Sequence, residues 1–166
     1  MTTEPASRPA RFPAEYGDPS KGDRTAWEEV EGKLAAASNY WVATNHPDGH
    51  PHVRPVDGVW IDGALVFGGS PETRWVRNLQ SDPRMTVNLG SEEDAVILEG
   101  TAELVDDPDH PLATPSTEAS MAKYPQYYPG GKAPPFHPFW MFRPTRAWAW
   151  TLTGFPAAAT RWDFDD

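Results

Sequence analysis

Two Asp-Gly pairs, Asp48-Gly49 and Asp62-Gly63, lie among short segments of strand-forming residues, and they constrain the fold more than any other feature of the chain. Asp and Gly tolerate the positive φ angles of tight hairpin turns. The segments that these pairs separate are Tyr40 to Thr44, about Pro51 to Ile61, and Ala64 to Gly68. Three consecutive strands joined by two tight turns predict an antiparallel meander.

Further strands are expected after this meander. Met85 to Leu89 alternates between apolar and polar residues, and Ala95 to Val105 is a long segment in which Gly100 predicts a bulge or bend. Two more strands are expected at Phe139 to Arg143 and at Ala147 to Leu152. Several short strands without a regular βαβ alternation predict a mainly β fold with flanking helices, in the form of a closed or partly closed antiparallel barrel.

Helices are predicted beside these strands. Thr25 and Glu28 form a capping-box pattern ahead of an apolar stripe that would fill about three helical turns. A second helix would have Ser70 as its N-cap and Pro71 at its first helical position. The segment from Asp106 to Met121 is expected to be a loop followed by a third helix.

The chain is 166 residues long, which fits one domain. Residues 1–24 are rich in proline, glycine and charge, so we expect a flexible or surface-draped arm there, ahead of a single domain over residues 25–166. Residues 124–138 are rich in proline, glycine and aromatic residues. They predict a surface connection that could act as a lid.

Composition excludes several classes of protein. The absence of cysteine excludes disulfide scaffolds, thiolate zinc sites and cysteine nucleophiles. A formal net charge of -10 argues against nucleic acid as a partner. No apolar run is long enough to cross a bilayer, so we expect a cytoplasmic protein without a membrane partner. The motifs of Rossmann dehydrogenases, P-loop NTPases, α/β-hydrolases and zincins are all missing.

An anion-binding site is predicted where Ser70, Thr73 and Arg74 gather at an expected helix start. Unpaired backbone N–H groups and the helix dipole favour an anion there, and an arginine can hold a phosphate with two parallel hydrogen bonds. The alternative is that Ser70 only caps the helix and Arg74 is a solvated charge. Arg54 precedes Pro55, which restricts this strand to an edge or a bulge. There Arg54 either faces a ligand or simply points into solvent.

Three histidines, His46, His50 and His52, lie close together in the sequence. His50 and His52 would share one face of a strand, and histidines can ligate metals. A zinc site, however, needs carboxylate or thiolate ligands and a hydrogen-bonded surrounding shell. The segment from Asp48 to His50 is better explained as a hairpin turn, and we predict no metal site.

The order and spacing of several segments resemble the pyridoxamine 5'-phosphate oxidase-like split-barrel superfamily, in particular its flavin and deazaflavin oxidoreductases. The resemblance covers about Leu34 to Leu104, and it is loose beyond Asp106. The segments that carry it are Tyr40-Trp41-Val42-Ala43-Thr44, the run from Pro47 to Val56, Asp62-Gly63-Ala64-Leu65-Val66-Phe67, Thr73-Arg74 through Asn78-Leu79, Asp82-Pro83-Arg84 and Leu98-Glu99-Gly100-Thr101-Ala102, with an ending similar to Thr160-Arg161-Trp162-Asp163-Phe164.

The resemblance implies a split β-barrel and a homodimer that holds two cofactors, FMN or coenzyme F-420, in grooves at its interface. The expected cofactor-binding residues are His52, Arg54, Pro55, Val56, Ser70, Thr73, Arg74 and Asn78. Among them, residues 54–56 would run beside the ring system, and Ser70, Thr73 and Arg74 would hold the phosphate. Many relatives carry lysine at the place of Arg74, and arginine preserves the charge but changes the donor geometry.

The implied function is that of an oxidoreductase which transfers a hydride between the bound cofactor and a small organic substrate. Such cofactors supply the hydride chemistry themselves, so no catalytic acid or base is assigned. Two alternatives stay open at this point. One is a non-catalytic protein that stores or protects a cofactor or a tetrapyrrole, and the other is a purely structural β-domain.

Overall fold

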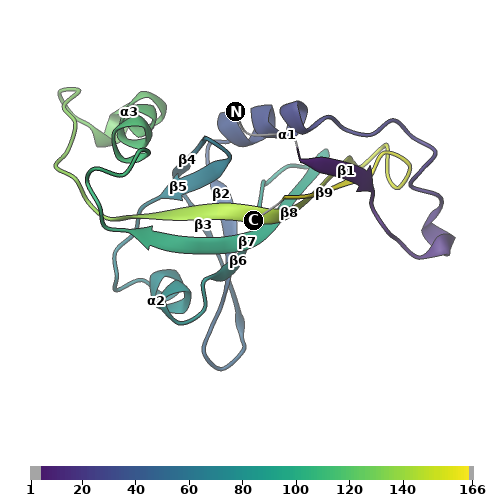
Figure 1. The fold of residues 1–166 in the computed structure, drawn as a ribbon, viewed down its shortest axis with the longest axis horizontal. Helices are drawn as coiled ribbons and strands as arrows, with labels where there is room; N and C mark the ends of the chain where they lie inside the picture. The colour runs from purple at the N-terminus through teal and green to yellow at the C-terminus, as the bar shows by residue number, and fades with distance from the viewer. Residues whose placement is uncertain (1–4, 165–166) are drawn as a thin grey trace.

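The computed structural model describes residues 5–164, and Figure 1 shows how their helices and strands are arranged. Among these residues one nine-stranded sheet forms. Its strands are β1 (Ala6–Pro9), β2 (Tyr40–Asn45), β3 (Pro51–Val56), β4 (Gly58–Ile61), β5 (Ala64–Phe67), β6 (Arg84–Asn88), β7 (Asp94–Val105), β8 (Phe139–Thr151) and β9 (Thr160–Asp163). The helices are α1 (Trp27–Ala36), α2 (Arg74–Ser81) and α3 (Ala113–Lys123), with short 3-10 turns η1 (Ala14–Tyr16) and η2 (Pro125–Tyr127).

The sheet closes on itself through a bend in the chain. Its main order is β1-β9-β8-β7-β6-β2-β3, while β5 pairs with β8 and β4 pairs with β5. Because β3 continues into β4 at Asp57, the strand that pairs with β2 leads directly into the one that pairs with β5. All these pairings are antiparallel, which confirms the predicted split barrel. The single strand expected from Pro51 to Ile61 is therefore two strands.

The long pair β7 and β8 forms the back of the barrel and is irregular at one point. Glu99 pairs with Arg146 and Gly100 pairs with Pro144, so Thr145 is the extra residue of a bulge. A Cβ built on Gly100 would lie 2.0 Å from the carbonyl oxygen of Arg143, which is why only glycine fits. The predicted bulge at Gly100 is confirmed. The two strands expected between residues 139 and 152 are one strand, because the bulge accommodates the proline.

The beginning of the described chain differs from the expected flexible arm. Residues Ala6–Pro9 form β1, which pairs with β9, and the guanidinium of Arg24 donates a hydrogen bond to the carbonyl oxygen of Ser7 at 2.9 Å. Residues 1–4 of the predicted arm lie outside the described part of the chain. Sequence patterns miss β1 because its side chains are mostly exposed and backbone hydrogen bonds hold it.

Helix α1 begins at Trp27 with Ala26 as its N-cap, and no side chain caps it. The predicted capping box from Thr25 is therefore wrong. The N–H group of Thr25 instead donates to Oγ1 of Thr160 on β9, at 3.0 Å. Thr25 therefore makes a tertiary hydrogen bond to Thr160 in place of the local capping box expected with Glu28. The apolar stripe predicted for this helix is confirmed, since Trp27, Val30 and Leu34 are buried.

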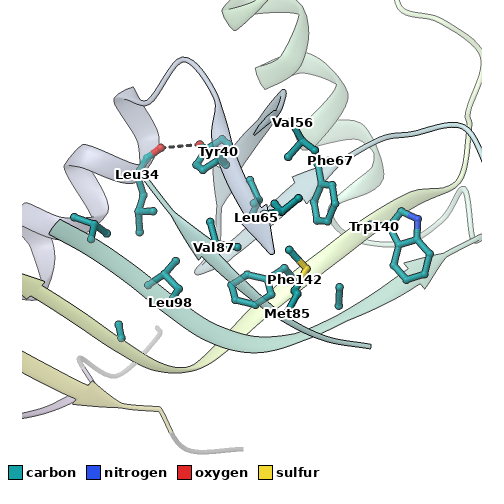
Figure 2. Close-up of a cluster of buried hydrophobic side chains, with 14 of the residues drawn as sticks. Leu34, Tyr40, Val56, Leu65, Phe67, Met85, Val87, Leu98, Trp140 and Phe142 are labelled. Atoms are coloured by element: carbon teal, nitrogen blue, oxygen red, sulfur yellow. Dashed lines mark hydrogen bonds between the residues drawn. The ribbon is translucent and has the colours of Figure 1, made fainter. Parts of the chain in front are cut away.

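The main hydrophobic core fills the barrel beneath α1 (Figure 2). Its fully buried side chains include Leu34, Tyr40, Leu98 and Phe142, and the hydroxyl of Tyr40 donates to the carbonyl oxygen of Leu34 at 2.6 Å. A second, smaller cluster lies under α3 and includes Val59, Val66, Leu112, Tyr124 and Phe139. The second cluster ties α3 to the hairpin of β4 and β5. None of the helices in residues 5–164 is long and apolar enough to span a membrane.

Candidate functional site

The turn between β5 and α2 carries three of the predicted site residues. Helix α2 begins at Arg74, with Thr73 as its N-cap. The hydroxyl of Thr73 donates to the carbonyl oxygen of Ser70 at 2.7 Å, and the N–H of Glu72 donates to Oγ of Ser70 at 3.3 Å. Ser70 therefore stabilises a turn ahead of the helix, since serine readily bonds to nearby backbone. The prediction that Ser70 caps the helix and Pro71 is its first helical residue is wrong by about one turn.

This turn lies directly on the hydrophobic core. The indole ring of Trp75 packs against Phe67, with ring centroids 5.3 Å apart, and Gly69 passes over the same indole. Ser70 and Arg74 are exposed, and Thr73 is half-buried. The first N–H groups of a helix have no carbonyl partner within it. The sequence thus places the exposed Ser70 hydroxyl, the Arg74 guanidinium and unpaired N–H groups on a backbone that the core holds in position.

Strand β3 brings two more predicted residues to the same region. Arg54 lies opposite Val42, and His52 lies opposite Thr44. Directly opposed residues of antiparallel strands point to the same face. Val42 and Thr44 are buried, so His52 and Arg54 are on the inner face of the sheet, where β3 forms its edge. Arg54 is exposed, and within residues 5–164 its guanidinium donates one hydrogen bond, to the neighbouring Val53 carbonyl oxygen at 3.1 Å.

Electrostatics connect β3 with the start of α2. Burial lowers the pKa of His52 below its ordinary value, and the positive charges of Arg54, Arg74 and, more weakly, His46 lower that pKa further. Charges that shift a pKa in this way lie within Coulombic range of the imidazole. The charges of Arg54 and Arg74 thus both reach His52, although β4 and β5 separate β3 from α2 in the chain.

The remaining predicted residues lie elsewhere. Asn78 is fully buried, and its Nδ2 donates to Oγ1 of Thr44 at 3.0 Å, which anchors α2 on β2, while its Oδ1 has no hydrogen-bond partner in the described part of the chain. Val56 is buried in the main core, so only its backbone could meet a ligand. Pro55 is exposed opposite Trp41, on the outer face of the sheet. Contacts from these three residues to a cofactor stay predictions.

The histidines near the first hairpin act within the turn. Nδ1 of His46 and Nδ1 of His50 lie 2.7 and 2.9 Å from the same carboxylate oxygen of Asp48. Gly49 has a φ of 91°, as the predicted hairpin requires. Across residues 5–164, no three His, Asp or Glu side chains are grouped so that they could hold a metal ion.

The outer face of β2 and β3 is apolar and open. Trp41 is 38% exposed and Val53 is 44% exposed. Pro55 lies opposite Trp41, and Val53 lies opposite Ala43, so all four side chains share this face. Large apolar side chains exposed together mark an interaction surface. We call these four residues the outer patch.

A cavity of about 350 Å³ adjoins the turn between β5 and α2. Phe67 and Gly68 line it, and the next residue is Gly69, which passes over Trp75. The opposite wall comes from α3 and from residues 124–138. Sequence reasoning assigned that last segment no residue of a site. Its only signal was the density of tyrosine and proline there.

The fold occurs in several solved structures. A conserved hypothetical protein from Mycobacterium tuberculosis is 20% identical over 76% of this chain and 85% of its own, with a TM-score of 0.64. An F420 reductase is 21% identical over 70% of this chain and 94% of its own, with a TM-score of 0.55. A heme binding protein from Mycobacterium smegmatis is 23% identical over 84% of this chain and 59% of its own, with a TM-score of 0.63.

Comparison with curated proteins finds no match. The family model described as pyridoxamine 5'-phosphate oxidase matches residues 26–151, which run from the N-cap of α1 to the end of β8. That range includes β3, the turn ahead of α2 and the closing bend of the barrel. The match therefore spans the whole closed part of the sheet, and the chain belongs to the pyridoxamine 5'-phosphate oxidase family, as the order of its sequence segments predicted.

Proposed function

We propose that this protein is an oxidoreductase that binds FMN or coenzyme F-420 and transfers a hydride between that cofactor and a small organic molecule. The observation that carries the proposal is the pair of guanidinium groups of Arg54, on the inner face of β3, and Arg74, at the start of α2, neither of which forms an ion pair among the described residues. Two guanidinium groups beside an open helix N-terminus suit a phosphate.

The residues of the site fit the phosphate end of such a cofactor. Arg54 and Arg74 offer guanidinium N–H groups, Ser70 offers its hydroxyl, and the first turn of α2 offers backbone N–H groups, while the Thr73 hydroxyl donates to the Ser70 carbonyl oxygen. None of these groups is committed to an ion pair with a carboxylate among the described residues. When bound, the flavin or deazaflavin ring supplies the hydride chemistry. This chain's residues bind the phosphate and orient the ring along β3.

We further propose that the protein works as a homodimer joined through the outer patch. Trp41, Val53 and Pro55 would be covered by a second copy, which would also enclose the edge of β3 beside Arg54. The apolar character of the patch supports this arrangement. A cofactor whose phosphate is at Arg54 and Arg74 would then lie next to the interface.

A second candidate is a tetrapyrrole-binding protein without catalytic activity. Two solved structures of the same fold support it, the heme binding protein and a heme storage protein from Vibrio cholerae, which is 16% identical over 70% of this chain with a TM-score of 0.58. Both likenesses concern the fold alone. A flavin-type cofactor is favoured over heme here because the site offers guanidinium groups for a phosphate.

The test is a set of equilibrium titrations of the purified protein with FMN, F-420 and hemin, read by fluorescence and absorbance. We expect FMN or F-420 to bind, and Arg54→Ala and Arg74→Ala each to weaken binding about 10- to 100-fold, the effect of losing a charged hydrogen bond. Oxidation of the reduced cofactor by any organic acceptor would eliminate the storage function.

Arg77→Ala is the matched control for these titrations. Arg77 is exposed one turn further along α2 and is not among the charges that lower the pKa of His52. We expect this variant to bind the cofactor within about twofold of the wild type, because exposed charges outside contact contribute little. The proposal fails if neither flavin-type cofactor binds, or if Arg77→Ala weakens binding as much as Arg74→Ala.

A further inference from the structure

The cavity beside the turn between β5 and α2 is shaped mainly by rings. Its volume of about 350 Å³ falls within the range of small-molecule sites in proteins. The rings that line it include Phe67, Tyr124, Tyr127, Tyr128 and Phe139. The rings of Tyr124 and Tyr127 are stacked, with centroids 5.9 Å apart and planes 28° apart. Flat walls of this kind accept a flat ligand by stacking and edge-to-face contact.

The acidic side chain that lines the cavity is Asp57, and the basic one is His137, while no lysine or arginine side chain lines it. Lys123 of α3 lies beside the cavity, since its ammonium donates to the carbonyl oxygen of the lining residue Gly58 at 2.8 Å and to the hydroxyl of Tyr40 at 3.1 Å. Lys123 is thus occupied by protein groups, and an anionic ligand beside Asp57 would meet a carboxylate.

Residues 125–138 are held over the cavity by side-chain hydrogen bonds of Tyr127 and Tyr128. The hydroxyl of Tyr127 donates to Oδ2 of Asp57 at 2.9 Å, and the hydroxyl of Tyr128 lies 2.8 Å from Oγ of Ser120 on α3. The ring of Tyr127 is 60% exposed, so its bond to Asp57 forms at the surface. Exposed hydrogen bonds contribute little net stability and can open readily.

The cavity and the proposed phosphate site meet at one stretch of the chain. Phe67 and Gly68 line the cavity, and Ser70 and Arg74 follow after Gly69. The turn that carries Ser70 therefore starts at the cavity wall, and hydride transfer requires the second molecule to lie close to the cofactor.

From these observations we infer that the cavity is the site of the organic substrate, and that it selects planar aromatic molecules without negative charge. The role as a substrate site rests on the function proposed above. Selection follows from the stacked rings and from Asp57, which favours a cationic or hydrogen-bond-donating group on the ligand and opposes a carboxylate or phosphate.

The test uses three ligands that share one ring system and differ in charge. They are 2-naphthol, 2-naphthoate and 2-naphthylmethylammonium, titrated into the full-length protein and followed by calorimetry and by ligand-observed NMR. We expect the neutral and cationic ligands to bind and the anion to bind at least about tenfold more weakly, the effect of a like charge nearby. Ser120→Phe, which fills the cavity, should abolish binding of all three.

A second variant separates charge selection from folding. Asp57→Asn keeps an oxygen that accepts the Tyr127 hydrogen bond, and it should reduce the affinity for the cation by about threefold while the affinity for 2-naphthol is unchanged. Asp62→Asn is the control, since Asp62 is exposed outside the cavity and asparagine tolerates its positive φ of 49°.

The two proposals can fail separately. Binding of 2-naphthoate as tightly as 2-naphthol, or unchanged binding to Ser120→Phe, overturns the inference about the cavity even if the cofactor binds. Titrations with FMN and F-420 judge the proposed function on their own, and we expect Ser120→Phe to bind the cofactor as the wild type does.

Discussion

Gly69 passes so close to the indole ring of Trp75 that a Cβ built on it would lie 2.0 Å from Cζ2 and 2.5 Å from Cη2 of that ring. Trp75 is buried against Phe67, so the ring cannot move aside freely. This contact fixes the turn that carries Ser70 and Thr73. The packing of Gly69 on Trp75 in the core therefore determines the position of the proposed phosphate site.

Gly69→Ala should displace this turn. We expect a loss of about 1–3 kcal/mol in the free energy of unfolding, as for other overpacked positions, and cofactor affinity about tenfold weaker. Chemical denaturation and cofactor titration measure the two effects. Gly68→Ala is the control, because a Cβ there has no atom within 4 Å, and it should leave stability nearly unchanged. Equal stability of the two variants would contradict the contact.

His52 should titrate below its ordinary pKa of 6.5, because burial and then the charges of Arg54 and Arg74 oppose its protonation. NMR of the imidazole, assigned with His52→Asn, measures this pKa directly. Arg54→Ala and Arg74→Ala should each raise it, and so should binding of an anion between the two arginines. An unchanged pKa in both variants would show that the two charges do not reach the imidazole.

The lowered pKa of His52 also makes the stability of the folded protein depend on pH. As the pH falls, His52 is protonated at a higher pH in the unfolded chain than in the folded protein. His52 should therefore reduce the stability of the folded protein below about pH 6.5, and His52→Asn should flatten this part of the curve. Denaturation of both proteins at several pH values checks the direction.

A charge in the outer patch should disrupt the proposed dimer. Val53→Asp places a carboxylate on this face, and burying an unpaired charge at an interface is costly. We expect the variant to sediment as a monomer at concentrations where the wild type is a dimer. Leu104→Asp introduces the same charge at an exposed position of β7, 48% exposed, and should leave the dimer intact. A wild-type protein that sediments as a monomer would end this proposal.

Gly100→Ala should destabilise the fold strongly, because the added Cβ meets the backbone of Arg143 and Pro144, which cannot rotate away. We expect a loss of about 3 kcal/mol or more in the free energy of unfolding, measured by denaturant titration. Gly32→Ala is the matched substitution on the exposed side of α1, where a Cβ has no atom within 4 Å. There alanine should stabilise the protein by about 0.5–1 kcal/mol.

The sequence predicted those parts of the structure that depend on local chemistry. The hairpins at Gly49 and Gly63 form as expected, with φ values of 91° and 68°, because turn conformation is a property of the turn residues themselves. Aromatic and β-branched residues located β2, and the apolar stripe located α1, for the same reason. The bulge at Gly100 also carried its own signal.

Other features were decided by contacts between distant segments. The start of α2 moved from Pro71 to Arg74, because Ser70 bonds within a turn that rests on Trp75. Strand β1 exists because β9 offers its edge, although residues 6–9 have no strand pattern. The local sequence around Ser70 or around residues 6–9 does not reveal Trp75 or β9 as a partner. Which segments make contact depends on how the whole fold brings them together.

The candidate site, too, was predicted in part from the sequence and in part decided by the tertiary structure. Sequence reasoning chose Arg54, Ser70, Thr73 and Arg74, whereas the tertiary structure places both arginines within electrostatic range of His52 and commits Asn78 to Thr44 inside the fold. The sequence by itself determined most of the barrel strands, the two hairpins and the residues able to bind a phosphate. Only the tertiary structure decided which of them meet and that a ring-lined cavity adjoins them, since pairing and burial depend on segments far apart in the chain.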